Sequence, residues 1–401
     1  MSTEWITSAE AARRLGVSAA TLYAYVSRGL LRSESTEGRR ERRYRADDVS
    51  RLKRRRDVGR KAESIAAHAL DFGTPVLESA LTLIENGRLY YRGHDAARLA
   101  RSMSLEQVAQ LLWECDDRPF AARNLPALST ALRAAWNATP TLSTVDACLV
   151  LLPAAARWDH PSWVEDRAAM LETGARILRL LTAAVTAEPV SALPVHEQLA
   201  AAWNVPSELA PLLRAALVLS ADHEFNASTF AARVVASTGA NLYGSTIAGI
   251  AAINGPRHGG STRRVAALLD ALATATDREA ELVRRADEPA DLPGFGHPLY
   301  PDGDVRAVTL LALMHEALPR SPALAFADAL AADIERASGR RPNIDFATVT
   351  LERVLGLPKD SALALFLLGR TVGWIAHALE QAANGGLIRP RARYIGPRPA
   401  A

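Results

Sequence analysis

Hydrophobic residues recur along most of the chain every three or four positions, which is the period of an amphipathic α-helix. This spacing predicts helices over residues 105–115, 128–136 and 326–337. Strictly alternating patterns, typical of strands, are almost absent, and turn signals rich in Gly, Pro and Asp separate the apolar segments. The pattern therefore predicts a mainly α-helical chain.

The longest uncharged segment, 234–256, is long enough to cross a bilayer. It contains Asn241, Asn254 and four glycines, so we expect a buried helix and a turn there instead of a membrane span. The first residues lack the cationic and apolar regions of a secretory signal peptide. Cys115 and Cys148 are too few for a disulfide framework or a four-ligand zinc site. We therefore expect a cytoplasmic protein.

Charge is unevenly distributed along the 401 residues, which are enough for two or three domains. The first 61 residues carry 16 basic and 8 acidic side chains, whereas the other 340 carry 31 and 36. A composition of 49% hydrophobic and 23% charged residues excludes wholesale disorder. The basic start of the chain indicates contact with a nucleic acid or another acidic surface, although a solvated basic face would carry the same charge.

Residues 8–31, SAEAARRLGVSAATLYAYVSRGLL, read as two short helices joined by a tight turn. We expect Ser8 to cap the first helix, Gly16 to end it and Ser18 to cap the second. The basic segment 39–45 looks like a hairpin wing. These features resemble the winged helix-turn-helix domain of the MerR and excisionase type over about the first 55 residues.

This resemblance implies DNA binding, with the second helix in the major groove and arginines on the phosphates. The side chains that it singles out for contact with DNA are Thr21, Tyr23, Arg28, Arg40 and Arg43. Guanidinium groups suit this purpose because they stay charged and can donate two hydrogen bonds to one phosphate. A small domain used only for protein contacts is the alternative.

Several polar residues stand inside otherwise apolar segments of the remaining chain. They are His223 in ADHEFNAS, His258 in NGPRHGGS, His297 in GFGHPLY, Arg306, Asp345 in PNIDF, Arg370 in GRTVGW and Arg389 in IRPRAR. Taken singly, each would serve equally well as a structural residue. The HExxH spacing of zinc proteases is missing around His223, and no metal site is predicted.

Taken together, the same residues indicate one kind of chemistry. A buried arginine needs an anion, and the body has no run of acidic residues for Arg306, Arg370 and Arg389, so we expect a small di- or tricarboxylate ligand. Burial would raise the pKa of Asp345 and suit it to removing a proton. Two histidines, one carboxylate and an arginine cluster are suited to forming an enol next to a carbonyl and adding it to a keto acid.

In this order, the motifs resemble those of the citrate synthase family from about Gly73 to Gly396. Further segments that carry the resemblance are NGRLYYRGHD, NASTFAARVVASTGANLYGSTIAGI and GRTVGWIAHALEQ. The resemblance implies a mainly α citrate synthase fold. The implied domains are a helix-turn-helix domain (1–57), a linker (58–72), a large helical domain (73–259 and 356–401) and a smaller helical insertion (260–355).

The resemblance also implies roles in condensing acetyl-CoA with oxaloacetate to citrate and CoA, a step of the tricarboxylic acid cycle. His258 resembles the residue that stabilises the acetyl-CoA enol, Asp345 the base that removes the methyl proton, and His297 the residue that polarises the ketone. Oxaloacetate ligands are implied at His223, Arg306 and Arg370, and an arginine that reaches the partner's site of a homodimer at Arg389. Acetyl-CoA is then a co-substrate, and no further cofactor is expected.

Three positions depart from the family pattern, and two alternatives stay open. Ser220 replaces a histidine of some bacterial members, and Pro298 and Pro301 replace basic residues near the CoA phosphates. A 2-methylcitrate synthase that uses propionyl-CoA fits the same residues, because one methylene changes discrimination by only about 1–3 kcal/mol. A transcriptional regulator that uses the body as a sensor of oxaloacetate or acyl-CoA is the alternative from another class.

Overall fold

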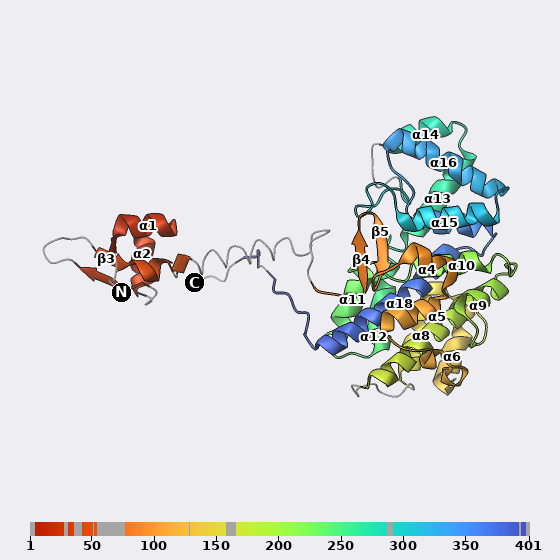
Figure 1. The fold of residues 1–401 in the computed structure, drawn as a ribbon, viewed down its shortest axis with the longest axis horizontal. Helices are drawn as coiled ribbons and strands as arrows, with labels where there is room; N and C mark the ends of the chain where they lie inside the picture. The colour runs from red at the N-terminus through yellow and green to blue at the C-terminus, as the bar shows by residue number, and fades with distance from the viewer. Residues whose placement is uncertain are drawn as a thin grey trace. The chain divides into compact units, whose positions relative to one another are not determined.

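The computed structural model describes residues 5–27, 31–35, 42–50, 52–53, 77–127, 129–157, 166–286, 292–392 and 394–397. The chain divides into two compact units, Met1–Glu78 (unit 1) and Ser79–Ala401 (unit 2). Helices dominate unit 2 (Figure 1), so the predicted mainly α class is confirmed. The predicted linker at 58–72 lies outside the described residues, and the domain bounds stay predictions.

Unit 1 combines two helices with a small antiparallel sheet. Its elements are β1 (Trp5–Thr7), α1 (Ser8–Leu15), α2 (Ala19–Ser27), β2 (Ser33–Ser35) and β3 (Arg42–Arg45), with strand order β1-β3-β2. Residues 46–50 are helical. Buried Leu22, Tyr44 and Val49 belong to one core cluster that includes both helices and the sheet. The predicted wing is present as β2 and β3, while residues 39–41 lie outside the described part.

Local side chains explain the turn between α1 and α2. Thr7, and not the predicted Ser8, caps α1: its Oγ1 accepts a hydrogen bond from the Glu10 amide, because β1 ends there in the extended conformation that a cap requires. Gly16 ends α1 at φ 62°, which glycine adopts without strain. Ser18 Oγ accepts from the Thr21 amide at 3.3 Å, as predicted for the cap of α2.

Unit 2 opens with a second antiparallel sheet, formed by β4 (Thr82–Glu85), β5 (Arg88–Tyr91) and β6 (His94–Asp95). Asn86 and Gly87 between β4 and β5 both have positive φ, as a two-residue hairpin turn of the right twist requires. Strands this short carry too few alternating positions to stand out from the helical pattern, and they were not predicted.

The remaining elements of unit 2 are helical. They are α4 (Ala96–Ser102), α5 (Leu105–Trp113), α6 (Thr130–Ala138), α7 (Thr144–Ala156), α8 (Arg167–Thr186), α9 (Val195–Ala202), α10 (Ala210–Leu219), α11 (Ala227–Ala236), α12 (Leu242–Ile253), α13 (Ser261–Thr274), α14 (Arg278–Ala286), α15 (Val305–Ala317), α16 (Pro322–Ser338), α17 (Ile344–Val354) and α18 (Ser361–Asn384), with 3₁₀ turns at Arg118–Phe120, Ala122–Asn124 and Thr139–Thr141. The three helices predicted from spacing correspond to α5, α6 and α16.

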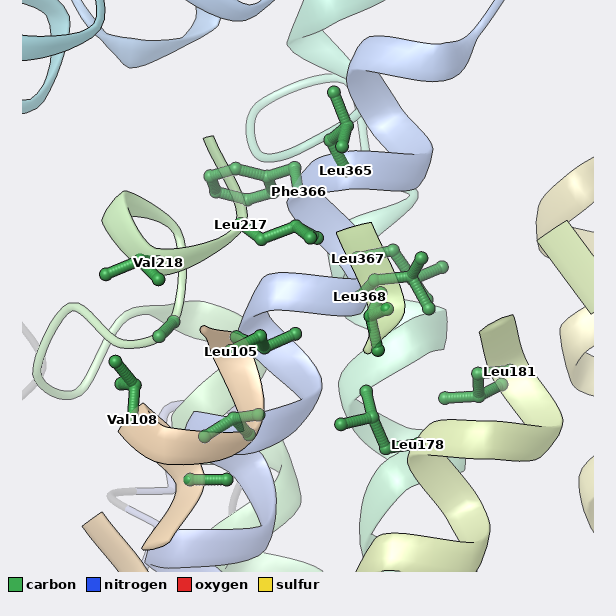
Figure 2. Packing of buried hydrophobic residues seen from close by; sticks show 14 of the residues in the cluster. Leu105, Val108, Leu178, Leu181, Leu217, Val218, Leu365, Phe366, Leu367 and Leu368 are labelled. Carbon is green, nitrogen blue, oxygen red and sulfur yellow. The ribbon is translucent and has the colours of Figure 1, made fainter. Parts of the chain in front are cut away.

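Helix α18 is the central element of unit 2. It packs against α5, α8, α10, α11, α12 and α17, and Figure 2 shows its leucines among side chains of α5, α8 and α10. Gly369 and Gly373 allow this approach, because a Cβ on either would lie 2.5 Å or less from a backbone oxygen of α10 or of the turn that follows it. Among the described residues, α18 is the one helix long and apolar enough to cross a membrane, and its apolar window is entirely buried.

The uncharged run 234–256 contains the last three residues of α11, helix α12 and the start of the turn after it, so the predicted helix and turn correspond to α12 and residues 254–256. Helix α11 ends at Ala236, and α12 begins after Asn241, whose side chain accepts from the Gly244 amide at 2.9 Å. The asparagine taken as evidence against a membrane span is therefore a helix cap, since its short polar side chain satisfies an otherwise free amide.

A second hydrophobic cluster lies at one end of unit 2, where Figure 1 shows α13, α14 and α16. Its buried residues include Leu268, Leu330, Phe346 and Val349. Helix α17 contributes to both clusters, because Ile344 and Leu351 pack into the larger core. The first turn of α17 therefore lies where the two cores meet.

Candidate active site

Six of the seven predicted site residues of unit 2 lie together, although they come from elements that are separated in sequence. His223 follows α10, His258 lies between α12 and α13, and His297 lies in the loop before α15. Arg306, Asp345 and Arg370 lie on α15, α17 and α18. All three histidines are at least partly buried, and their pKa values respond to Arg306 or Arg370, so the fold brings these groups together.

His223 and His297 face each other at one side of this cluster. Their ring centroids are 5.1 Å apart in an edge-on arrangement. The Tyr300 hydroxyl lies 3.0 Å from His223 Nε2. Burial, followed by nearby Arg306 and Arg370, holds the pKa of His223 well below its ordinary value. His223 is therefore neutral at neutral pH.

The backbone fixes the tautomer of His297. Its Nδ1 accepts a hydrogen bond from the Leu299 amide at 3.2 Å, so the ring proton of the neutral form lies on Nε2. Burial and Arg306 lower the pKa of His297 to about 4. Gly294 and Gly296, both with positive φ, shape the loop that carries it. His297 can thus donate one hydrogen bond without being charged.

His258 is held by side chains of α11 and α18. Its Nε2 lies 2.7 Å from Ser228 Oγ, which also accepts from Trp374 Nε1 at 3.1 Å and lies 2.8 Å from Asn226 Oδ1. The Phe366 ring packs edge-on against the imidazole with centroids 5.9 Å apart. Burial, with Arg370 and Arg306, lowers the pKa of His258 to about 3, so this ring is neutral as well.

Asp345 is the carboxylate of the cluster. Its Oδ2 accepts from the Ser261 hydroxyl at 2.8 Å, and its backbone amide is held by Asn343, the cap of α17. Burial raises the pKa of Asp345 to about 6, although the Ser261 hydroxyl opposes the shift. A carboxylate with this pKa is ionised at neutral pH and is a stronger base than an exposed aspartate.

Arg306 already has an acid partner, so of the three arginines for which the sequence offers no run of acidic residues, this one does not need a ligand to neutralise it. Asp304 accepts from Arg306 Nε at 2.9 Å and from Nη2 at 2.7 Å. Burial acts to lower the pKa of Arg306, but Asp304 outweighs it and raises this pKa. Asp304 also accepts from the Ile344 amide at 3.1 Å, which ties α15 to the first turn of α17.

Arg370 keeps one unsatisfied group. Its Nε donates to the Ser220 carbonyl at 2.9 Å and its guanidinium packs on the Phe366 ring, but Nη2 is buried without a hydrogen-bond partner among the described residues. Burial and Arg306 lower its pKa only to about 10, so the charge remains. A buried, charged and unpaired guanidinium is a site for an anion.

The family of the chain is shown by its similarity to known proteins. The family model "Citrate synthase, C-terminal domain" matches residues 70–391. The chain belongs to the citrate synthase family. It is 33% identical to the citrate synthase of Haloferax volcanii over 363 residues, which cover 81% of this chain and 95% of that protein. It is 30% identical to the 2-methylcitrate synthase of Mycobacterium tuberculosis over 346 residues, 78% of this chain and 86% of that protein.

Solved structures agree with this assignment. Thermotoga maritima citrate synthase is 29% identical with a TM-score of 0.69, covering 82% of this chain and 96% of that one. Thermoplasma acidophilum citrate synthase, solved as a ternary complex with carboxymethyl coenzyme A and oxaloacetate, is 25% identical with a TM-score of 0.68 and the same coverage. The chain is thus an acyltransferase-type enzyme of the citrate synthase family.

The model "MerR HTH family regulatory protein" matches residues 6–57, which confirms the resemblance of unit 1. Tyr23 is exposed, and the Arg42 guanidinium lies over its ring at 5.4 Å. Thr21 is partly buried with its hydroxyl 2.9 Å from that of Ser18, and Arg43 is exposed on β3. Arg28 and Arg40 lie outside the described residues.

The remaining predicted residue, Arg389, is not part of the citrate synthase cluster within one chain. It is exposed in the segment after α18.

Sequence reasoning missed the residues that orient the cluster, namely Ser228, Ser261, Tyr300 and Asp304. Asp304 had a signal, since an acid stands two positions before Arg306, whereas Ser228 lies 30 residues from His258 and only the fold brings them together. In the described parts of the chain, no group of His, Cys, Asp and Glu side chains could hold a metal ion.

Proposed function

We propose that unit 2 condenses acetyl-CoA with oxaloacetate to give citrate and CoA. The observation that carries this proposal is the unpaired guanidinium of Arg370 in a cluster with neutral histidines and a carboxylate whose pKa is about 6. The guanidinium would hold a carboxylate of the keto acid. The other groups supply one base and two uncharged donors, which proton abstraction and carbon–carbon bond formation require.

In the first step, the Asp345 carboxylate takes a methyl proton of acetyl-CoA, and the electron pair of that bond moves toward the thioester oxygen. His258 stabilises this oxygen. When the Ser228 hydroxyl turns its single proton from Asn226 Oδ1 to His258 Nε2, the ring proton lies on Nδ1 and is free to donate to the substrate. A neutral donor suits an enol better than a cation, which would protonate it fully.

In the second step, the enol carbon attacks the ketone of oxaloacetate. His297 polarises the ketone through Nε2 and gives its proton to the new alkoxide, and the proton that Asp345 took from the methyl group restores it through solvent. Water then hydrolyses the citryl-CoA thioester and releases CoA. His223 and Arg306 complete the keto acid site: when the Tyr300 hydroxyl donates to His223 Nε2, Nδ1 of that ring carries the proton and faces a carboxylate as a donor.

We further propose a cytoplasmic homodimer in which Arg389 reaches the partner's site, with acetyl-CoA as co-substrate and no resident cofactor. The exposed position of Arg389 supports this arrangement. A 2-methylcitrate synthase reaction with propionyl-CoA remains the alternative, and the relatives include proteins of both names.

The test is release of free CoA thiol from acetyl-, propionyl- and butyryl-CoA in the presence of oxaloacetate. Acetyl-CoA should have the highest kcat/KM, and Asp345→Ala should abolish release. Asp333→Ala, which removes a half-buried carboxylate of α16 that pairs with Arg278 and Arg336, is the matched control and should retain full activity. No thiol release with any of the three thioesters would refute the enzymatic proposal, and a higher kcat/KM with propionyl-CoA would assign the 2-methylcitrate reaction.

A second function, DNA binding by unit 1, is supported by exposed Tyr23 and Arg43 and by the surplus of 8 basic charges in the first 61 residues. Coupled to the first, it would make the protein a regulator that senses oxaloacetate or acyl-CoA. A mobility-shift selection from a randomised duplex library at physiological salt, with and without oxaloacetate, tests it. Absence of binding even at low salt would refute it.

A further inference from the structure

Two buried groups of opposite charge in unit 2 are both left incompletely paired. Arg370 Nη2 and Asp222 Oδ1 each lack a hydrogen-bond partner among the described residues. Their charges interact, because Asp222 acts to raise the pKa of Arg370. An unpaired buried charge is costly, so these two groups would gain free energy by closing on each other.

Hydrogen bonds to the other carboxylate oxygen of Asp222 oppose this closure. Its Oδ2 accepts from the Thr82 hydroxyl at 2.6 Å and lies 3.2 Å from His377 Nε2. Burial alone would raise the pKa of Asp222, but His377 and Arg370 outweigh it and hold this pKa below its usual range. Asp222 is therefore charged, and Thr82 of β4 and His377 of α18 hold its Oδ2, while its Oδ1 lies beside Gly373 of α18.

The orientation of His377 is itself set by a neighbour. Its Nδ1 lies 3.3 Å from Arg233 Nη1, which can only donate, so the proton of the neutral ring lies on Nε2 and points at Asp222. Arg233 also donates to Glu380 and to Gln381, both on α18. His377 is wholly buried, so its ring cannot exchange these partners for water.

We propose that His377, assisted by Thr82, is a positioning residue that holds Asp222 away from Arg370 and so keeps this guanidinium open for the keto acid. Asp222 immediately precedes His223, so the same restraint fixes the loop that carries a second keto acid ligand. The inference rests on the proposed function and adds to it a residue that does not touch substrate. Without His377, Asp222 would pair with Arg370 and compete with the substrate carboxylate.

The experiment measures oxaloacetate binding by calorimetry, and KM and kcat by thiol release, for four proteins. His377→Leu should weaken oxaloacetate binding and raise its KM by about tenfold or more, with a much smaller change in the KM for acetyl-CoA. His377→Gln, which can still donate to Asp222, should retain most of the affinity. The double variant His377→Leu with Asp222→Asn should regain affinity, because it lacks the competing charge.

Two further variants separate this effect from lost stability. Thr82→Val removes the other donor to Asp222 Oδ2 with less disturbance, and should weaken oxaloacetate binding in the same sense if His377→Leu does not fold. Thr182→Val, which removes a buried hydroxyl that bonds only to its own helix, should leave binding unchanged. Wild-type affinity in His377→Leu or Thr82→Val, or no recovery in the double variant, overturns the inference alone. A wild-type protein that neither binds oxaloacetate nor releases thiol overturns the proposed function together with it.

Discussion

Replacing Ser261 by alanine should shift the pH dependence of catalysis while leaving the maximal rate largely intact. The Ser261 hydroxyl donates to Asp345 at 2.8 Å and stabilises its charged form, so its loss should raise the pKa of Asp345 above the present value of about 6. A hydrogen bond to a charged group contributes about 1.5–3 kcal/mol, or roughly one to two pH units. Because Asp345 is only partly shielded from solvent, we expect about one unit.

The expected profile of kcat/KM has a single acid limb. His258 and His297, with pKa values of about 3 and 4, do not titrate above pH 5, so one proton should govern the limb. The wild-type midpoint should lie near pH 6, and that of Ser261→Ala near pH 7, so the variant at pH 6 should retain about a fifth of the wild-type rate. Both proteins should reach similar rates near pH 8.5.

The assay should follow loss of thioester absorbance, which does not depend on ionisation of the released thiol. Ser261→Thr, which keeps the hydroxyl, is the control and should show the wild-type midpoint. A wild-type limb near pH 4 would refute the raised pKa of Asp345. An unchanged midpoint with a lower plateau in Ser261→Ala would show that the hydroxyl orients the base and does not tune it.

Three other results are expected. Asp345→Asn should abolish turnover yet raise the melting temperature of the protein above pH 6. The pKa of Asp345 is higher in the folded than in the unfolded state, so the free energy of unfolding falls as the pH rises from about 4 to about 6. Removing the charge should recover on the order of 2 kcal/mol of this free energy. Arg370→Gln should raise the KM for oxaloacetate at least about tenfold, as measured by thiol release, because it removes the unpaired guanidinium. Arg43→Ala should weaken DNA binding uniformly across sequences and reduce the salt slope by about one, as measured by mobility shift at several salt concentrations.

Much of the fold follows from features that are local in sequence. The period of apolar residues predicted α5, α6 and α16, and Gly16 and Ser18 predicted the end of one helix and the cap of the next. The strands of unit 2 escaped because each has four residues or fewer, so packing on helices and not intrinsic alternation stabilises them.

The principal residues of the candidate site were predictable from the sequence, whereas the residues that hydrogen-bond to them were not. His258, Asp345 and Arg370 stand out because each is polar within an apolar segment. The partners that set their protonation, such as Ser228 and Asp304, are ordinary residues whose importance depends on three-dimensional proximity. The absence of an acidic run for the three arginines did not reveal the partner of Arg306, because a single aspartate two residues away pairs with it in the folded chain.

The buried helix α18 has a consequence for how the protein fails. Its 24 residues are apolar enough to pass for a membrane span, and α5, α8, α10, α11, α12 and α17 pack against it. Heating that separates these helices would expose a long apolar segment to other unfolded chains. Aggregation of the unfolded protein would then be faster than its refolding. The rate of unfolding then determines how long unit 2 stays folded on heating. The apparent melting temperature should therefore rise with the heating rate.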